Sequence, residues 1–138
     1  MRKVWMFLLL GLWLVGCGKG GSGSLESEMN ASLQETNPFV FQYEVSNRTD
    51  KDITLDFSSS QRFDYSVKND QGEQIYLFSS VTMFMAVLGE ETIKQGETLS
   101  YEINLQELDL KEGNYSLSVW LTPTEGEAYQ VTKEVTVK

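Results

Sequence analysis

The chain of 138 residues contains no histidine. This absence excludes the Ser-His-Asp and Cys-His catalytic arrangements and the usual zinc sites. It also removes the side chain that most often performs general acid–base catalysis near neutral pH. Catalysis would have to rest on paired carboxylates such as Glu90 and Glu91, or Glu125 and Glu127, and these lie in predicted turns without an apolar pocket around them. The sequence therefore predicts a protein that is not an enzyme and carries no cofactor.

The chain also lacks an apolar run long enough to span a bilayer. The run from Val4 to Gly16 has thirteen residues, whereas a membrane-spanning helix needs about 20. It follows the basic start Met1-Arg2-Lys3, and its length fits the ~7–15 residues of the apolar part of a secretory signal peptide. Residues 1–16 are therefore predicted to be a signal peptide.

Cysteine occurs once, at Cys17, directly after this run. The sequence Leu14-Val15-Gly16-Cys17 resembles the lipobox of bacterial lipoproteins. In that resemblance the Cys17 thiol receives a diacylglycerol, the chain is cut before it, and Cys17 becomes the new N-terminus. The alternative, a buried free cysteine, is disfavoured because the following residues, Gly18-Lys19-Gly20-Gly21, offer no folded surroundings. Two or more acyl chains, at ~0.8 kcal/mol per buried CH₂, would anchor the protein to the outer side of the bacterial cell membrane.

Basic residues are scarce. Without Arg2 and Lys3, the remaining 9 basic side chains face 20 acidic ones, a formal charge of −11 for residues 17–138. Such a chain repels phosphate backbones and anionic headgroups, which disfavours nucleic acid as a partner and leaves membrane attachment to the lipid on Cys17. With Cys17 acylated no disulfide is available, so a single domain must be held by its apolar core, for which about 100 residues suffice.

Residues 17–37 are polar and aperiodic and are predicted to be a flexible tether behind the lipidated N-terminus. From Pro38 the pattern changes to the two-residue period of half-buried strands. Turn signals such as "NDQGE", "KQGE" and "KEGN" separate these strands. Seven short strands with this spacing indicate an all-β antiparallel sandwich over residues 38–138. The predicted strands are "FVFQYEV", "DITLDF", "FDYSV", "QIYLF", "TLSYEINL", "YSLSVWL" and "YQVTKEVTV".

Tyr115 begins one of these strands, two residues after Gly113. This arrangement resembles the tyrosine corner of immunoglobulin-like sandwiches, in which the phenol hydroxyl bonds to a nearby backbone group. The antibody version has a cysteine two residues later, and this chain has Leu117 there. Tyr115 is therefore predicted to be structural, in an immunoglobulin-like sandwich without the disulfide.

The chain from Val45 to Leu121 resembles the intracellular proteinase inhibitor (BsuPI) domain family. The residues that carry the resemblance are "VSNRTDKDITLDFSSSQRFDYSV", then Gly72, Phe84, Gly96-Glu97 and Gly113-x-Tyr115. The resemblance implies an immunoglobulin-like sandwich and inhibition of a serine proteinase. The family is named for an intracellular inhibitor, whereas Cys17 predicts a location outside the cytoplasm, so the resemblance does not identify the target.

Gln61, Arg62 and Asp64 lie at a predicted strand start and are candidates for contact with a partner. The alternative, which we favour, is that Gln61 and Asp64 bond to loop backbone and fix a turn. Asp50, Asp52 and Asp56 invite a calcium site, but the EF-hand spacing fails, because Leu55 and Gln61 stand where glycine and glutamate are required. A solvated strand edge is the favoured interpretation of these carboxylates.

Two apolar features are further candidates for partner binding. Alternation along "YSLSVWL" directs Trp120 outward, where it could be a binding hot spot or a sugar-stacking platform. The alternative, which we favour because singly exposed apolar residues need no explanation, is that a neighbouring strand or the tether covers it. Met83, Phe84 and Met85 could form an adaptable tip. The helical spacing of Phe84, Val87 and Leu88 favours instead a short helical cap that plugs one end of the sandwich.

These observations predict a lipid-anchored, non-catalytic domain that binds a protein outside the cytoplasm, with a proteinase as the candidate target. A loop inserted into a proteinase cleft would inhibit without catalytic residues. The alternative is a module that binds carbohydrate or another cell-envelope polymer through Trp120 and nearby tyrosines.

Overall fold

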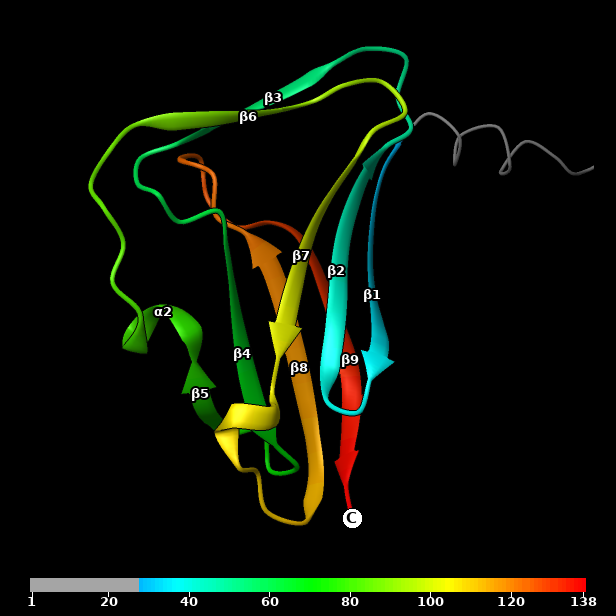
Figure 1. Ribbon diagram of the computed structural model, residues 1–138, viewed down its shortest axis with the longest axis vertical. Helices are drawn as coiled ribbons and strands as arrows, with labels where there is room; N and C mark the ends of the chain where they lie inside the picture. Colours follow the sequence, from blue (N-terminus) through cyan, green and yellow to red (C-terminus); the bar gives the residue numbers. More distant parts are fainter. Residues whose placement is uncertain (1–27) are drawn as a thin grey trace, which may run out of the picture.

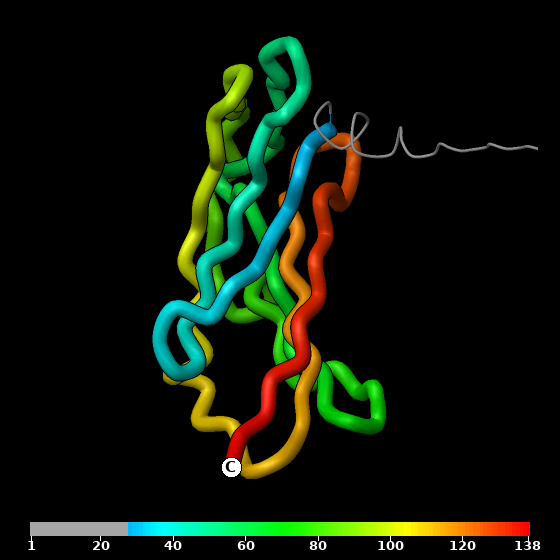
Figure 2. The backbone as a smooth tube through the Cα atoms, turned by 90° about the vertical axis from the view of Figure 1, so that its right-hand side faces the viewer, coloured from blue at the N-terminus to red at the C-terminus, as the bar shows by residue number. Residues whose placement is uncertain are grey.

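The computed structural model describes residues 28–138, and they form a sandwich of two antiparallel sheets (Figure 1). One layer has three strands in the order β1-β2-β7, and the other has four strands in the order β5-β4-β8-β9. The view from the side shows the two layers facing each other (Figure 2). The predicted all-β sandwich is therefore confirmed.

The first layer consists of β1 (Met29–Asn37), β2 (Val40–Asn47) and β7 (Thr98–Asn104). The second consists of β4 (Phe63–Asn69), β5 (Gln74–Leu77), β8 (Gly113–Leu121) and β9 (Ala128–Val137). A separate two-stranded ladder pairs β3 (Ile53–Phe57) with β6 (Gly89–Ile93). One helical turn, α2 (Phe78–Val81), follows β5, and a 3₁₀ turn, η1 (Gln106–Leu108), follows β7. All seven predicted strands are present, together with two that were not predicted, β1 and β6.

β1 lies inside the segment that was predicted to be a tether. It pairs with β2 along its length, from Met29 opposite Asn47 to Asn37 opposite Val40, and Leu33 is 6% exposed in the core. The folded part therefore begins before Pro38, and the predicted boundary was wrong. β1 is an edge strand: Leu33 lies in the core and Met29 and Ala31 pack against it, whereas the polar residues from Gln34 to Asn37 face solvent. The predicted signal peptide, Cys17 and the first part of the tether lie outside the described residues.

The ladder of β3 and β6, called the arm below, extends beyond one end of the sandwich (Figure 1). The chain leaves β2 into β3 and returns from β6 into β7, so both crossings lie at the base of the arm. There the fully buried Asn47 donates its amide group to the carbonyls of Lys51 and Ile93, at 2.8 and 2.7 Å. Its Oδ1 accepts the N–H and the hydroxyl of Thr49, at 2.9 and 2.6 Å. One buried side chain thus fixes how the arm joins the sandwich.

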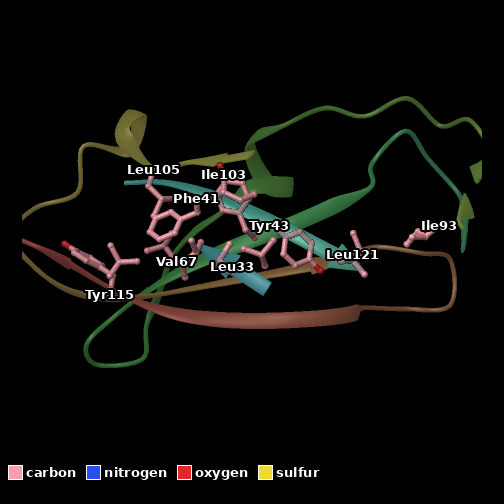
Figure 3. Close-up of a cluster of buried hydrophobic side chains, with 14 residues drawn as sticks. Leu33, Phe41, Tyr43, Val67, Ile93, Ile103, Leu105, Tyr115 and Leu121 are labelled. Carbon is pink, nitrogen blue, oxygen red and sulfur yellow. The ribbon is translucent and has the colours of Figure 1, made fainter. Parts of the chain in front are cut away.

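The core fills the space between the two layers with alternating side chains from both (Figure 3). On β2, every second residue from Phe41 to Val45 is at most 1% exposed, and β8 contributes Leu117, Val119 and Leu121 at 0%. Ile93 lies at the arm end of the labelled row and Tyr115 at the opposite end (Figure 3). Two-residue alternation on both inner faces is what a sandwich core requires.

Tyr115 forms the predicted tyrosine corner. Its hydroxyl donates a hydrogen bond of 2.6 Å to the carbonyl of Lys111, four residues earlier. Gly113 between them has a φ of 153°, and Tyr115 itself is 8% exposed. The phenol therefore ties the connection before β8 to the edge of the core, as expected for a residue that serves the fold.

Candidate functional site

An exposed apolar segment connects α2 to β6. Of the six exposed large hydrophobic residues among residues 28–138, five lie in this segment: Val81 (64%), Met83 (96%), Met85 (67%), Val87 (47%) and Leu88 (87%). We call residues 81–88 the apolar loop. The surrounding sequence from Ser79 to Gly89 contains no charged residue. Contiguous exposed apolar side chains of this kind mark an interaction surface more often than isolated ones do.

The apolar loop is not the helical plug that the sequence predicted. Helical structure is confined to the single turn Phe78–Val81, and Thr82 already has an extended backbone, with φ −126° and ψ 139°. Residues 82–88 form neither helix nor strand. The plug prediction failed because the spacing of Phe84, Val87 and Leu88 does not by itself determine a helix, and Val87 and Leu88 are exposed and lie outside the core cluster.

Phe84 is the one large side chain of the apolar loop that turns inward. Its ring meets Phe78 edge-on, with centroids 6.0 Å apart and planes at 72°. Phe78 stacks in turn on Tyr65 at 4.8 Å and on Phe63 at 5.5 Å, and both of these lie on β4. A chain of aromatic contacts therefore anchors the centre of the loop to the sandwich, since such pairs stabilise by about 0.5–1.5 kcal/mol each beyond burial.

Ser60 holds the next residue of the loop by its backbone. The Ser60 N–H donates to the carbonyl of Met85 at 2.8 Å, and the Met85 N–H donates to the Ser60 hydroxyl oxygen at 2.8 Å. The connection between β3 and β4 thus lies beside the apolar loop. Because both polar groups of the Met85 backbone are bonded, the loop is fixed at this point even though the Met85 side chain is exposed.

Arg62 supports the end of the apolar loop. Its Nε donates to Glu91 at 2.8 Å, its Nη1 donates to the Ser59 carbonyl at 2.9 Å, and the guanidinium lies 4.6 Å from the centre of the Phe57 ring. The same guanidinium lies against Gly89, where an added Cβ would approach Nη2 to 2.7 Å. Arg62 therefore joins the arm to the residue at which the loop enters β6, and any larger residue there would have to displace the guanidinium.

The other two polar candidates at this strand start bond to backbone within the domain. The Gln61 side-chain amide donates to the Phe63 carbonyl at 3.0 Å. Asp64, 6% exposed, accepts the N–H groups of Tyr65 and Ser79, at 2.9 and 3.0 Å. These bonds match the turn-fixing alternative. Asp64 also ties the first residues of α2 to β4, so it helps to set where the apolar loop begins.

Trp120 is buried, not exposed. It is 8% exposed, lies opposite Asp64 in the β4–β8 ladder, and is separate from the core cluster between the sheets. The register between β8 and β9 shifts between Val119 and Leu121, so simple alternation does not describe its surroundings. The exposed platform on which the sugar-binding alternative depended is therefore absent, and Trp120 is withdrawn as a partner-binding candidate.

Acidic side chains border the end of the apolar loop. A shallow depression beside it is lined by Asp56, Phe57, Leu88, Gly89, Glu90 and Thr124. The turn between β8 and β9 is held to the arm there, by a 2.7 Å hydrogen bond from the Thr124 N–H to the Asp56 carbonyl. The surface around the loop thus combines apolar side chains with negative charge.

Three tyrosines that lie in the core or pack against it have a raised pKa. Burial, followed by the nearby Glu91 carboxylate, raises the pKa of Tyr101 to about 12. Burial also raises the pKa of Tyr43 and of Tyr65. These shifts follow from packing in the core and do not mark an acid–base pair.

Residues 28–138 contain no group of three or more potential metal-ligating side chains placed to hold an ion. No helix in this part of the chain is long and apolar enough to cross a membrane.

Of the predicted site residues, Met83, Phe84 and Met85 lie in the apolar loop, and Arg62 lies beside Gly89, where the loop enters β6. Ser60 was missed as a supporting residue, although it lies in the "SSSQRF" sequence that carried the family resemblance. Its contact with Met85 joins residues 25 positions apart, which no local pattern reveals. Cys17 lies outside the described residues.

The fold defines an all-β sandwich domain with a projecting apolar loop. The sequence matches the family described as intracellular proteinase inhibitor, BsuPI, over residues 25–126. This match spans most of the folded domain and includes Ser60, Arg62 and the whole apolar loop. The chain belongs to the BsuPI family.

No curated protein sequence matches the chain significantly. Among solved structures, Bacteroides uniformis beta-glucuronidase 2 covalently bound to cyclophellitol-6-carboxylate aziridine is similar, with a TM-score of 0.39 and 12% sequence identity. The likeness covers 78% of this chain and 13% of that chain, so the chain spans only a small part of the enzyme's length.

Proposed function

We propose that this protein is a lipoprotein anchored outside the cytoplasm through Cys17, whose sandwich domain binds and inhibits a proteinase without a catalytic step of its own. The observation that carries the proposal is the apolar loop, exposed yet held in place, in a member of a proteinase inhibitor family. Inhibition by occupation requires only a surface that fills the cleft of the proteinase and stays there.

The rigidity of the loop supports this function. Association costs free energy for every flexible segment that must be ordered, at about 0.5–1.5 kcal/mol per side chain with many rotamers. The contacts of Ser60, Arg62 and Phe84 order the loop in the free protein. An apolar surface that is ordered before binding is suited to tight association, because most of its contact energy remains available for the partner.

The partner is tested by capture from the native envelope. The full-length protein, purified in detergent, is immobilised and exposed to solubilised envelope proteins, and proteinase activity is measured on the captured material before and after release. We expect to capture a proteinase that shows no proteolytic activity while it is bound and regains activity once it is released. Capture of no proteinase, or of one that is active while bound, would refute the proposed inhibition.

The anchor is tested by metabolic labelling with a fatty acid that carries a chemical tag. We expect the wild-type protein to incorporate the label and Cys17→Ala to incorporate none, because the thiol is the acceptor in the predicted lipobox. Ser22→Ala, close by in the same segment, serves as the control and should be labelled like the wild type. Equal labelling of Cys17→Ala, or no labelling of the wild type, would remove the lipid anchor from the proposal.

A further inference from the structure

Within the apolar loop, Met83 differs from its neighbours in two respects. Its side chain is 96% exposed, the highest value among the exposed large hydrophobic residues of the described chain. Within residues 28–138, no hydrogen bond occupies its backbone N–H or its carbonyl. Met85, the next outward side chain, has both backbone groups bonded to Ser60. Met83 therefore offers the most exposed side chain of the loop together with a free backbone, and it lies near the middle of the loop, whereas Leu88, which shares both features, lies directly before β6.

The residues on either side keep Met83 in this position. Before it, α2 is tied to β4 by the bond from the Ser79 N–H to Asp64. After it, the Phe84 ring is anchored on Phe78, and Met85 is bonded to Ser60. Thr82 has an extended backbone. Met83 thus directly follows an extended residue, in a stretch that is held at both ends.

A serine proteinase recognises this combination. Its cleft binds one extended segment, accepts the residue before the scissile bond in a side-chain pocket, and bonds the carbonyl of that residue in the oxyanion hole. Met83 can supply the side chain and the carbonyl without breaking a bond of the free protein. An unbranched thioether fits a deep apolar pocket, whereas a pocket with a carboxylate at its base would reject it.

We propose that the apolar loop enters the cleft of a serine proteinase as a substrate would, with the Met83 side chain in an apolar primary specificity pocket and the Met83–Phe84 peptide bond at the catalytic serine. This inference rests on the proposed inhibition and adds to it the residue that occupies the specificity pocket and the peptide bond that faces the catalytic serine. If the bond is hydrolysed, water adds across it and leaves a carboxylate on Met83 and an amine on Phe84. Inhibition persists as long as the anchors on each side hold the loop in the cleft.

The test uses the full-length protein in detergent against subtilisin and chymotrypsin, which accept large apolar residues, and trypsin, which requires a basic one. We expect the wild type to inhibit at least one of the first two. Met83→Asp should weaken that inhibition at least ~100-fold, because an unpaired carboxylate would be buried in the pocket. Met83→Leu should stay within ~5-fold of the wild type, and Met83→Lys should shift inhibition toward trypsin.

Ile75→Asp is the matched control, since it places the same charge on an exposed large hydrophobic residue of β5, outside the apolar loop, and it should change inhibition less than ~5-fold. Thermal unfolding of each variant shows whether the domain remains folded. Unchanged inhibition by folded Met83→Asp, or an equal loss in Ile75→Asp, would overturn the assignment of Met83.

Cleavage mapping separates this inference from the proposed function. When the wild type is incubated with a small amount of subtilisin, the first cut is expected between Met83 and Phe84. A cut there without inhibition would support substrate-like entry of the loop and refute the inhibitory function. A wild type that neither inhibits nor is cut at this bond would overturn both.

Discussion

Replacing Asn47 by aspartate is expected to lower the free energy of unfolding by roughly 3 to 5 kcal/mol at neutral pH. The Asn47 amide group donates to the carbonyls of Lys51 and Ile93 in a fully buried position. A carboxylate there has no hydrogen to donate, leaves both carbonyls without their partner, and buries an unpaired negative charge. The total free energy of unfolding of a domain of this size is only about 5–15 kcal/mol, so the loss is a large part of its stability.

Urea unfolding of the full-length variant measures this effect, with Asn69→Asp as the matched control. Asn69 also ends a strand and accepts backbone N–H groups with its Oδ1, from Gln71 and Glu73 at 3.0 Å each, but it lies at an exposed turn. We expect the control to stay within about 1 kcal/mol of the wild type. A loss in Asn47→Asp as small as that of the control would contradict the structural role assigned to the base of the arm.

Replacing Arg62 by alanine is expected to weaken inhibition of the captured proteinase at least ~10-fold. The substitution removes the bonds to Glu91 and to the Ser59 carbonyl together with the contact on the Phe57 ring. It also frees the space beside Gly89, where the loop joins β6. The loop would then sample several conformations, and binding would have to order it again.

Titration of the captured proteinase with each variant measures this change, and Arg48→Ala provides the control at an exposed arginine near the base of the arm. Arg62→Lys should recover part of the inhibition, because one ammonium can replace the ion pair but not the planar contact with Phe57. If Arg62→Ala inhibits as well as Arg48→Ala does, the positioning role of Arg62 is wrong.

The sandwich could be predicted because apolar and polar residues alternate along most of its strands. This alternation can be read from the sequence of each strand by itself. Phe41, Tyr43 and Val45 alternate with polar residues, and all three are buried as expected. The tyrosine corner was equally local, since Tyr115 bonds to a carbonyl only four residues away. Both features depend on a few neighbouring residues, so they can be predicted without knowing how distant segments pack.

β1 and β6 were missed because both strands consist largely of polar residues and lack a clear alternation of apolar and polar residues. β1 buries Leu33 well but leaves the residues from Gln34 to Asn37 exposed, so its sequence resembles a linker. β6 reads "GEETI" and pairs only with β3 in the arm. Each of the two segments forms a strand because it pairs with another strand, β1 with β2 and β6 with β3, and this pairing cannot be read from the segment's own residues.

The candidate site was predicted only in part, for the same reason. Their apolar character identified Met83, Phe84 and Met85 as candidates. Whether these side chains fill the end of the sandwich or project into solvent depends on which other segments pack against them. For Trp120, alternation directs the side chain outward, and its burial agrees with the favoured alternative that another segment covers it. In both cases the outcome depends on packing between segments far apart in the chain, such as Ser60 beside Met85.

The most direct test of the account replaces residues 82–88 by a glycine-serine segment of the same length in the full-length protein. The variant and the wild type are then compared in the capture and inhibition assay on the native envelope. We predict that the wild type silences the captured proteinase, whereas the loop variant, with its urea midpoint preserved, neither captures nor inhibits it. Equal inhibition by the two proteins would contradict the claim that this loop is the surface through which the domain acts.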